Sequence, residues 1–288
     1  MDLKILSWNV EHFRGPRANW IGLSDNQKDA EQAARVARVV QTLNAINPDI
    51  FAILEVEGDN SPYEVAAAMP GYSFLLTEGK QSQEILVGFR SGLRLFFTQK
   101  GDFKENNLYL RPAPVISVAT DSGRELSILF GHFKSAPDPA GWGLRASMFE
   151  KLGDLKKSLD GYAVLNGEPS AAFVAMGDLN TMGLELKDST DDIDAARELA
   201  RFDTRLGRRN MRRPVKSHAN TFSQGTGGTY PDSDLDHVYL DESLAILPEG
   251  GHEVRVGGWA ELAAGPARDQ WIADFSDHAP IWFTLTGL

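Results

Sequence analysis

The stretch Leu3-Lys4-Ile5-Leu6-Ser7-Trp8-Asn9 opens the chain with an apolar run that ends in an amide side chain. A capping box follows at Ser24-Asp25-Asn26-Gln27, and apolar residues then recur at helical spacing up to Ile46. This helix must end before Asn47-Pro48. The next segment, 50–54, is a continuous apolar run, which is typical of a buried strand. The order strand, helix, strand predicts an α/β fold.

The rest of the chain contains more short apolar runs than a simple alternation of strands and helices can hold. We expect helices over 144–159 and 194–202, and strands near 72–76, 85–89, 93–97, 115–119, 126–130, 172–176, 238–240 and 281–285. This pattern predicts two β-sheets packed face to face with helices outside. The sequence contains no Pro- or Ser-rich linker, so we expect a single domain over residues 1–288. Three long loops, at 99–111, 203–233 and 249–270, are expected to have functional roles.

Composition restricts the classes of protein and site. Of the 288 residues, 42% are hydrophobic and 9% aromatic, which is enough to form a core and argues against disorder. The chain has no cysteine, so a metal would have to bind oxygen or imidazole ligands. It has no visible signal peptide and no apolar run near the ~20 residues that cross a bilayer. We therefore expect a cytoplasmic protein without a membrane segment, and the sequence indicates no protein partner.

The charge distribution permits two interpretations. A net charge of -11 argues against a polyanionic partner. The segment 201–216 is an exception, because it carries six arginines and Lys216 against a single acid, Asp203. These cations could bind phosphates, or they could be a solvated helix end and loop that offset the acidic residues just upstream.

Several predicted strands end in residues of the types that bind hard metals or transfer protons. Strand ends are rigid and the loops beside them face solvent, so these residues suggest one active centre assembled from the whole length of the chain. Each also has an ordinary explanation on its own, as a turn residue, a surface acid or a structural histidine. The candidates are Asn9, Glu55, His132, Asp178, Asn180, Asp236, Asp277 and His278.

The chemistry of these residues fits hydrolysis of a phosphoester. Such a reaction needs a hard cation, a base that activates water, and donors that stabilise the developing charge. Magnesium suits this role because it requires only one or two protein carboxylates. Glu55 is the first candidate ligand, and Glu57 is a less favoured competitor because it lies further from the strand. Asp236 could support an imidazole and raise its basicity, as general-base catalysis requires.

Four motifs contain most of these residues: Ser7-Trp8-Asn9, Glu55, Gly177-Asp178-Leu179-Asn180 and Ser276-Asp277-His278-Ala279-Pro280. Together they resemble the motifs of the endonuclease/exonuclease/phosphatase superfamily, which includes deoxyribonuclease I. The motifs occur in the family's order over nearly the whole chain. The resemblance implies a four-layer α/β sandwich, in which two mixed β-sheets are flanked by helices. It also implies a metal-dependent phosphoesterase that uses Mg²⁺, with Mn²⁺ as a substitute.

The resemblance further implies a role for each site residue. Glu55 matches the principal metal ligand, with Asn9 and Asp277 beside the metal. Asp178 and Asn180 match the pair that orients water and phosphate. The remaining implied roles are Asp236 as the acid paired with His278, His132 as a second histidine that contacts the phosphate or acts as an acid, and Asn9, Arg111 and Asn180 as phosphate-binding residues.

Two shorter matches favour the deoxyribonuclease I branch. The segment 83–90 resembles the strand whose glutamate supports the second histidine, which would be Glu84. The segment 111–115 resembles the one whose arginine reaches the substrate phosphate, which would be Arg111. Each residue could instead be a surface charge. The abasic-site endonuclease branch is disfavoured because it usually carries a different residue where His132 stands.

The expected reaction is in-line attack of water on a phosphodiester of DNA or RNA, without a covalent intermediate. Either Asp178 or the Asp236–His278 pair could be the base. An alternative substrate is a small-molecule or lipid phosphoester, which the overall acidity of the chain favours. A third possibility is a binding module that keeps the fold without catalysis. The complete set of core residues argues against this third class.

Overall fold

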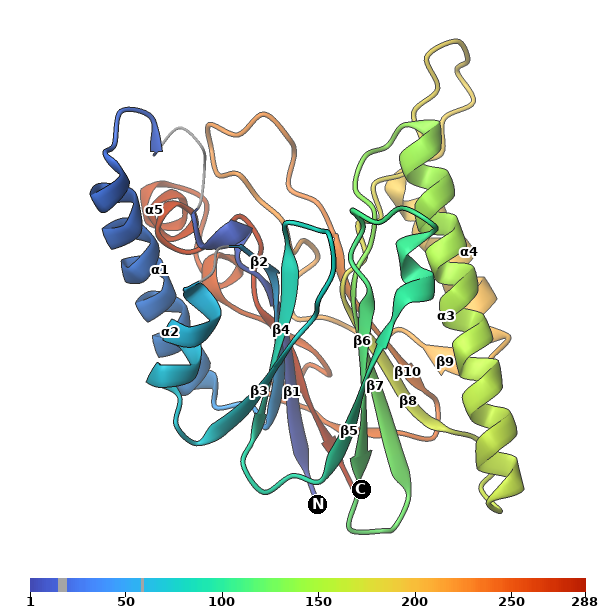
Figure 1. Cartoon of the computed structure of the whole chain (residues 1–288). Coiled ribbons are helices and arrows are strands. Elements are labelled where there is room, and N and C mark those ends of the chain that lie inside the picture. The colour runs from blue at the N-terminus through green and yellow to red at the C-terminus, as the bar shows by residue number, and fades with distance from the viewer. Residues whose placement is uncertain (15–19, 58–59) are drawn as a thin grey trace.

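The computed structural model describes residues 1–14, 20–57 and 60–288. Two mixed β-sheets lie face to face at its centre, and helices cover their outer faces (Figure 1). In the first sheet the strand order is β11, β13, β1, β2, β4 and β3, and β12 pairs with β13. These strands are β1 (Leu3–Asn9), β2 (Ile50–Val56), β3 (Tyr72–Leu76), β4 (Glu84–Arg90), β11 (Ala245–Leu247), β12 (Arg255–Val256) and β13 (Ile281–Thr286).

The second sheet has the strand order β5, β6, β7, β8, β10 and β9. Its two central pairings differ in direction, because β7 and β8 are parallel whereas β8 and β10 are antiparallel. These strands are β5 (Leu95–Lys100), β6 (Ala113–Ala119), β7 (Glu125–His132), β8 (Ala172–Asp178), β9 (Met211–Arg212) and β10 (Asp236–Asp241).

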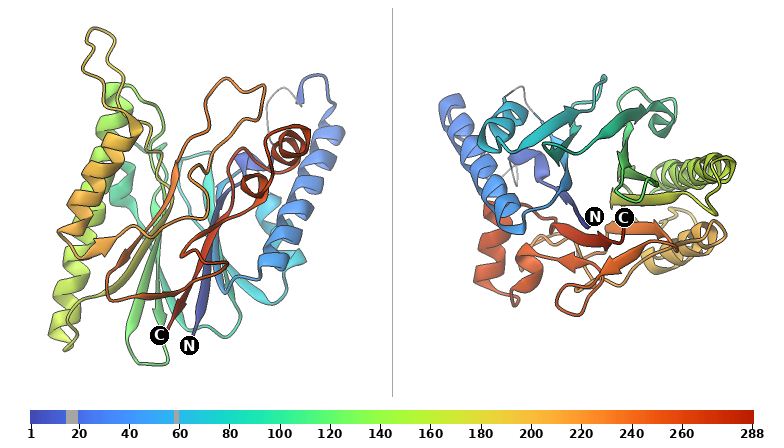
Figure 2. Two further views of the ribbon diagram at one scale, coloured as in Figure 1. Left: turned by 180° about the vertical axis from the view of Figure 1, so that it is seen from behind. Right: turned by 90° about the horizontal axis from the view of Figure 1, so that it is seen from below.

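Helices complete the outer layers on both sides (Figures 1 and 2). Helices α1, α2 and α5 lie on the side of the first sheet, and α3 and α4 cover the second. Their bounds are α1 (Asp25–Ile46), α2 (Ser61–Ala68), α3 (Pro139–Leu165), α4 (Ala195–Gly207) and α5 (Pro266–Asp274). The described part of the chain has no helix that is both long and apolar enough to span a membrane.

Three hydrophobic cores separate the four layers. Strand β2 shows how they arise, because alternate side chains point to opposite faces of a strand. Ala52 and Leu54 pack in the central core between the sheets, whereas Phe51 and Ile53 pack in the core beneath α1. A third core lies between the second sheet and helices α3 and α4. The continuous apolar runs reflect this burial on both faces, and the predicted four-layer α/β sandwich is confirmed.

The two ends of the chain meet within the first sheet. Strand β1 pairs antiparallel with β13 and parallel with β2. Just beyond these pairings the Trp8 Nε1 atom donates to the His278 carbonyl at 2.9 Å, and the Ser276 hydroxyl donates to the Asn9 carbonyl at 2.7 Å. The polar residues that follow β1 and precede β13 are therefore neighbours, although they lie almost 270 positions apart in the sequence.

The structure also differs from the predicted elements. Helix α3 is longer than the predicted helix over 144–159, and α4 extends to Gly207. Helices α2 and α5 were not predicted. They are only 8 and 9 residues long, too short for a clear helical period. Helix α5 occupies part of the segment 249–270 that was expected to be a loop.

Candidate functional site

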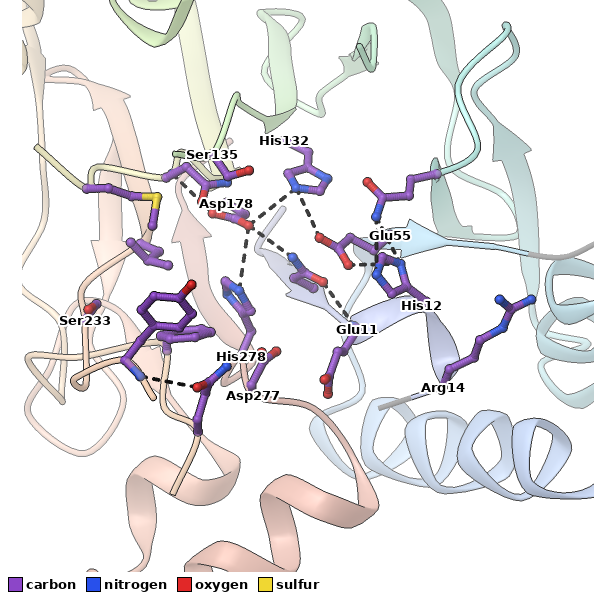
Figure 3. A pocket seen from close by; sticks show the side chains of 18 of the residues that line it. Glu11, His12, Arg14, Glu55, His132, Ser135, Asp178, Ser233, Asp277 and His278 are labelled. Atoms are coloured by element: carbon purple, nitrogen blue, oxygen red, sulfur yellow. Dashed lines mark hydrogen bonds and ion pairs between the residues drawn. The ribbon is translucent and has the colours of Figure 1, made fainter. Parts of the chain in front are cut away.

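A pocket of about 1430 Å³ is lined by side chains from both sheets (Figure 3). The strand ends that carry them lie opposite the chain termini (Figure 1). Of the predicted site residues, those that line the pocket are Asn9, Glu55, Arg111, His132, Asp178, Asn180, Asp277 and His278.

Asp178 lies at the centre of the site because of strand register. At the end of β8 it pairs with His132 of β7 on one side and with Asp236 of β10 on the other. Asn9, from the opposite sheet, donates its side-chain amide to Asp178 Oδ2 at 3.0 Å. The backbone amide of Asn180 donates to the other carboxylate oxygen at 3.2 Å. This register explains how three predicted residues from separate segments reach one point.

The carboxyl group of Asp178 holds its proton unusually strongly. Burial and the carboxylates of Asp236 and Glu55 raise its pKa, while His278 and the hydrogen bond from Asn9 oppose the rise, and the net pKa is about 7. A carboxyl group that titrates near neutral pH can both accept and release a proton.

His278 and Asp236 form the predicted pair of imidazole and carboxylate. His278 Nδ1 lies 2.8 Å from Asp236 Oδ2, and its Nε2 lies 3.8 Å from Asp178 Oδ2. Burial alone would lower the pKa of His278, but Asp236 and Asp178 outweigh it and raise that pKa well above its usual value. The ring of Phe222 packs edge-on against the imidazole at 5.2 Å between centroids and restricts its orientation. The imidazole is therefore held cationic, with Nε2 on the side of Asp178.

His132 is neutral, in contrast to the cationic His278. Burial and the nearby Arg111 guanidinium hold the pKa of its imidazole well below the usual range. Arg111 Nη2 lies 2.8 Å from His132 Nε2 and donates to it, because a neutral imidazole accepts at that nitrogen. Among the described residues, His132 Nδ1 has no hydrogen-bond partner. The structure thus brings together Arg111 and His132 beside Asp178, as a cation and a neutral ring.

Glu55 occupies an irregular point in strand β2. The pairing of β2 with β4 shifts register between Ile53 and Val56, and Glu55 has a φ of 61°. A left-handed backbone at a non-glycine residue is strained, and such strain is commonly found at functional sites. The bulge directs the carboxylate into the pocket, where Oε1 lies 3.4 Å from His132 Nε2 (Figure 3). Glu57, the less favoured alternative, instead contacts His12 and Arg14 at the rim.

Acidic groups crowd the side of the pocket near Glu55. Burial and the charge of Asp277 raise the pKa of Glu11 to about 8, and burial and Glu55 raise the pKa of Asp277. Among the described residues, the buried Glu11 Oε2 has no hydrogen-bond partner. Donor atoms of Glu55, His132 and Asp178 lie within 4.8 Å of one another. Carboxylate oxygens gathered in this way fit a hard divalent cation such as Mg²⁺ or Mn²⁺, and Arg35, 3.7 Å from Glu11 Oε2, compensates only part of their charge.

The structure does not place Glu84 where the sequence predicted it. Its Oε2 accepts hydrogen bonds from Thr77 Oγ1 at 2.5 Å and from Gln81 Nε2 at 2.7 Å, and no bond joins it to His132 among the described residues. The preceding residue, Gln83, lines the pocket and contacts His12. Adjacent residues of an extended chain point to opposite sides. The sequence match therefore located the correct strand, but it assigned to Glu84 a position that Gln83 occupies.

The pocket residues that sequence reasoning missed include Glu11, His12 and Phe222. His12 Nδ1 lies 3.1 Å from Glu55 Oε2. Both Glu11 and His12 have positive φ values, in a turn that directly follows Asn9. Their position next to a strand-end amide was the available signal. Phe222 gave no such signal, because it contacts the imidazole only through the chain's tertiary fold.

The arginine-rich segment lies away from this pocket, and most of its cations have intramolecular partners. Carboxylates pair with four of them, and Arg201 stacks on Trp142 at 5.5 Å. Arg208 and Arg209 form no ion pair with any residue that the structure describes. The paired cations are Arg205 with Glu150, Arg212 with Glu253, Arg213 with Asp203 and Lys216 with Asp234.

Comparison with known structures reveals the same fold at low sequence identity. Truncated Caenorhabditis elegans TDP2 has a TM-score of 0.66 and 15% identity, over 100% of this chain and 98% of that one. An endonuclease/exonuclease/phosphatase from Beutenbergia cavernae gives 0.64 and 15%, over 99% and 71%. D. rerio TDP2 complexed with a single-strand DNA product gives 0.61 and 15%, over 99% of both chains.

Comparison of the sequence with curated proteins gave no match. The sequence model of the Endonuclease/Exonuclease/phosphatase family, in contrast, matches residues 6–278. This match covers nearly the whole chain, including every residue described in the pocket. The chain belongs to the endonuclease/exonuclease/phosphatase family.

Proposed function

We propose that this protein is a Mg²⁺-dependent phosphoesterase that hydrolyses phosphodiester bonds in nucleic acid. The observation that carries the proposal is the convergence of Glu55, Asp178 and the Asp236–His278 pair in one pocket. Hydrolysis of a phosphoester is served by acids with raised pKa that can transfer protons, by a cationic imidazole and by a group of carboxylates that can hold a metal.

Glu55 would hold the metal, with Asp277 and Asn9 beside it. A bound Mg²⁺ supplies neutralising charge to the phosphate oxygens. The side-chain amide of Asn9 also donates to Asp178, so it ties the metal side of the pocket to the proton-transfer side. Asn180, which follows Asp178, would orient the phosphate from the opposite sheet.

The charge states divide the proton-transfer roles that the sequence left open. Asp178 would accept the proton of the attacking water, because its pKa of about 7 leaves part of it ionised at neutral pH. His278 would remain cationic and face the developing negative charge, with Asp236 as its partner. Arg111 would hold a non-bridging oxygen beside the neutral His132.

Nucleic acid as the substrate is supported by one neighbour and by the shape of the site. The similar D. rerio TDP2 is described in complex with a single-strand DNA product. The pocket of about 1430 Å³ is larger than a single phosphate requires, and the aromatic side chains of Trp20, Phe222 and Tyr230 line it. Aromatic side chains can stack on bases that are not paired.

A small-molecule or lipid phosphoester is the second candidate, and the charge balance favours it. Most cations of the 201–216 segment have partners within the chain. The described pocket lining contains more acids than bases, and a long polyanion would gain little from it. The acids are Glu11, Asp25, Asp29, Glu55, Asp178, Glu185 and Asp277, against Arg14, Lys28, Arg111 and the cationic His278.

The test is hydrolysis of a substrate panel by the purified protein, with Mg²⁺, with Mn²⁺ and after chelation. The panel contains plasmid DNA, single-stranded DNA, RNA, abasic DNA, bis(4-nitrophenyl) phosphate, inositol phosphates and sphingomyelin. We expect cleavage of single-stranded DNA or RNA that stops on chelation and returns with Mg²⁺. Activity that survives chelation, or none on any member of the panel, would contradict the proposal.

Salt concentration separates the two substrate classes. Binding of a nucleic acid weakens with salt in proportion to the number of phosphates that the protein neutralises. We expect KM for an oligonucleotide to rise with NaCl more steeply than KM for bis(4-nitrophenyl) phosphate. Equal slopes, together with faster hydrolysis of a small ester, would favour the second candidate.

A further inference from the structure

A buried ion pair lies behind the pocket, between helices α3 and α4. Arg145 and Glu198 are 0% and 1% exposed. Arg145 Nε donates to Glu198 Oε1 at 3.0 Å, and Nη2 donates to Oε2 at 3.1 Å. This two-pronged geometry is the most directional form of a salt bridge.

The same guanidinium also binds two loops. Nη1 donates to the carbonyls of Lys134 at 3.1 Å and Ala136 at 2.7 Å, and Nη2 donates to that of Gly183 at 2.8 Å. Glu198 Oε2 accepts the Gly183 amide at 2.7 Å. All five N–H donors of Arg145 are thus used, which a lysine with one nitrogen could not reproduce.

Both loops continue directly from residues of the pocket. The His132 loop (133–137) follows β7, and the Asp178 loop (179–185) follows β8. The Asn180 side chain donates to the Phe133 carbonyl at 3.1 Å, which joins the loops to each other. Several of their residues line the pocket: Ser135, Ala136, Pro137, Asn180, Thr181, Met182 and Glu185.

The backbone of the His132 loop needs such support. Ala136 has a φ of 90°, a left-handed value that alanine rarely adopts, and a strained residue persists only where its surroundings enforce it. Its carbonyl is the one that Arg145 binds most closely. In the Asp178 loop, Gly183 has a φ of 82°, and a Cβ atom there would lie 2.2 Å from the Ile193 carbonyl. The His132 loop therefore has a conformation that depends on contacts from outside, and the Asp178 loop needs glycine at position 183.

From this geometry we infer that Arg145 and Glu198 are positioning residues of the pocket. They touch no reacting atom. They hold the two loops in register, and through them the side chains of His132, Asp178 and Asn180. Catalysis depends steeply on such placement, since a displacement of about 1 Å can cost about 10²-fold in rate.

A second buried ion pair on the same helix serves as a matched control. Lys156 and Asp241 are 0% and 1% exposed and lie 2.7 Å apart. Asp241 is at the end of β10 away from Asp236, and it binds Ser170 and Ser243 rather than a pocket loop. Loss of either pair should lower stability, because Arg145 or Glu198 would stay buried without its partner and Lys156 would keep only Asp160. Only loss of the first pair should disturb the pocket.

The experiment compares Glu198→Gln and Arg145→Lys with Asp241→Asn. Hydrogen exchange of peptides covering 133–137 and 179–185 is the first readout, and it needs no activity. We expect exchange there to speed up about tenfold in the first two variants and to stay at the wild-type rate in Asp241→Asn. Thermal unfolding shows whether each variant folds.

Kinetics are the second readout, and they rest on the proposed function. With bis(4-nitrophenyl) phosphate and Mg²⁺, we expect kcat to fall about tenfold in Glu198→Gln and Arg145→Lys, with KM within about twofold of wild type. Asp241→Asn should keep the wild-type kcat. An inactive wild-type protein would contradict the proposed function. Hydrogen exchange in the two loops would still show whether Arg145 and Glu198 are positioning residues. Wild-type exchange in both loops, or an equal loss of kcat in Asp241→Asn, would overturn this inference.

Discussion

The two sides of the pocket are built in different ways. On the side of the first sheet, Glu55 and Glu11 sit on left-handed backbone and crowd together as acids. On the side of the second sheet, Asp178 and His132 end regular parallel strands, and a fully bonded guanidinium holds the loops that follow. The side of the first sheet concentrates negative charge, and the side of the second sheet holds its side chains in fixed positions.

This difference indicates what each side contributes. Carboxylates that repel one another gain stability when a cation neutralises them, so the first side is suited to bind the metal. Proton transfer depends on distance and orientation, so the second side needs rigid support. Asn9 is the bridge between them, since it belongs to the first sheet and donates to Asp178 of the second.

The largest loss of activity is expected from a change at Asp178, at the centre of the second-sheet side of the pocket. Replacing Asp178 with Asn keeps the shape of the side chain but removes the group that would accept a proton. We expect kcat to fall by about 10³-fold, within the range of general-base contributions, with little change in stability. Steady-state kinetics on the best substrate of the panel measures it. Near-normal turnover in this variant would show that Asp178 is not the base.

The next effect tests the first side. Glu55→Gln removes a direct metal ligand, and we expect Mn²⁺ to bind at least about tenfold more weakly, with kcat about 10²-fold lower at limiting metal. Calorimetric titration with Mn²⁺ measures the affinity. Glu84→Gln is the control, because Glu84 lies outside the pocket and should retain wild-type affinity. An equal loss in both variants would refute the assignment of Glu55.

A third prediction concerns pH. Burial raises the pKa of Asp178 to about 7 and of Glu11 to about 8, so the folded metal-free protein binds protons that the unfolded chain releases near pH 4. Their contribution to stability is complete below pH 4 and is lost as pH rises through 7 and 8. We expect Tm without metal to fall by a few degrees from pH 6 to pH 9, at roughly 2–4 °C per kcal/mol.

Metal should reverse this trend, because a cation favours the ionised carboxylates. Scanning calorimetry with and without Mg²⁺ should therefore give a larger gain in Tm at pH 8.5 than at pH 6. Asp178→Asn is the control, since its Tm should depend less on pH. A gain that is the same at both pH values would mean that the raised acids do not bind the metal.

The smallest effect concerns the arginine-rich segment, which belongs to neither side. Arg208→Ala with Arg209→Ala removes the two cations of the segment that have neither an ion pair nor an aromatic partner in the described structure. We expect KM for an oligonucleotide to change by less than about twofold, because this segment does not line the pocket. A rise in KM and a shallower salt dependence would instead identify the segment as a phosphate-binding arm.

Much of the fold and site could be predicted because the signals are local. The continuous apolar run of β2 results from burial on both faces, and the motifs around Asp178 and His278 lie at strand ends. Other features are not local. That Gln83 rather than Glu84 lines the pocket, and that Lys216 pairs with Asp234, 18 positions away, follow from contacts between distant segments.

The order of the elements and the chemical types at the strand ends could be read from the chain alone, since periodicity and residue chemistry depend on neighbours in the chain. Which side chains share the pocket, and in which charge state, depends on how the chain folds. His132 is neutral beside Arg111, whereas His278 is cationic beside Asp236. The two histidines are the same residue type in one pocket, and their charges differ because pKa is set by burial and by charges brought near through folding.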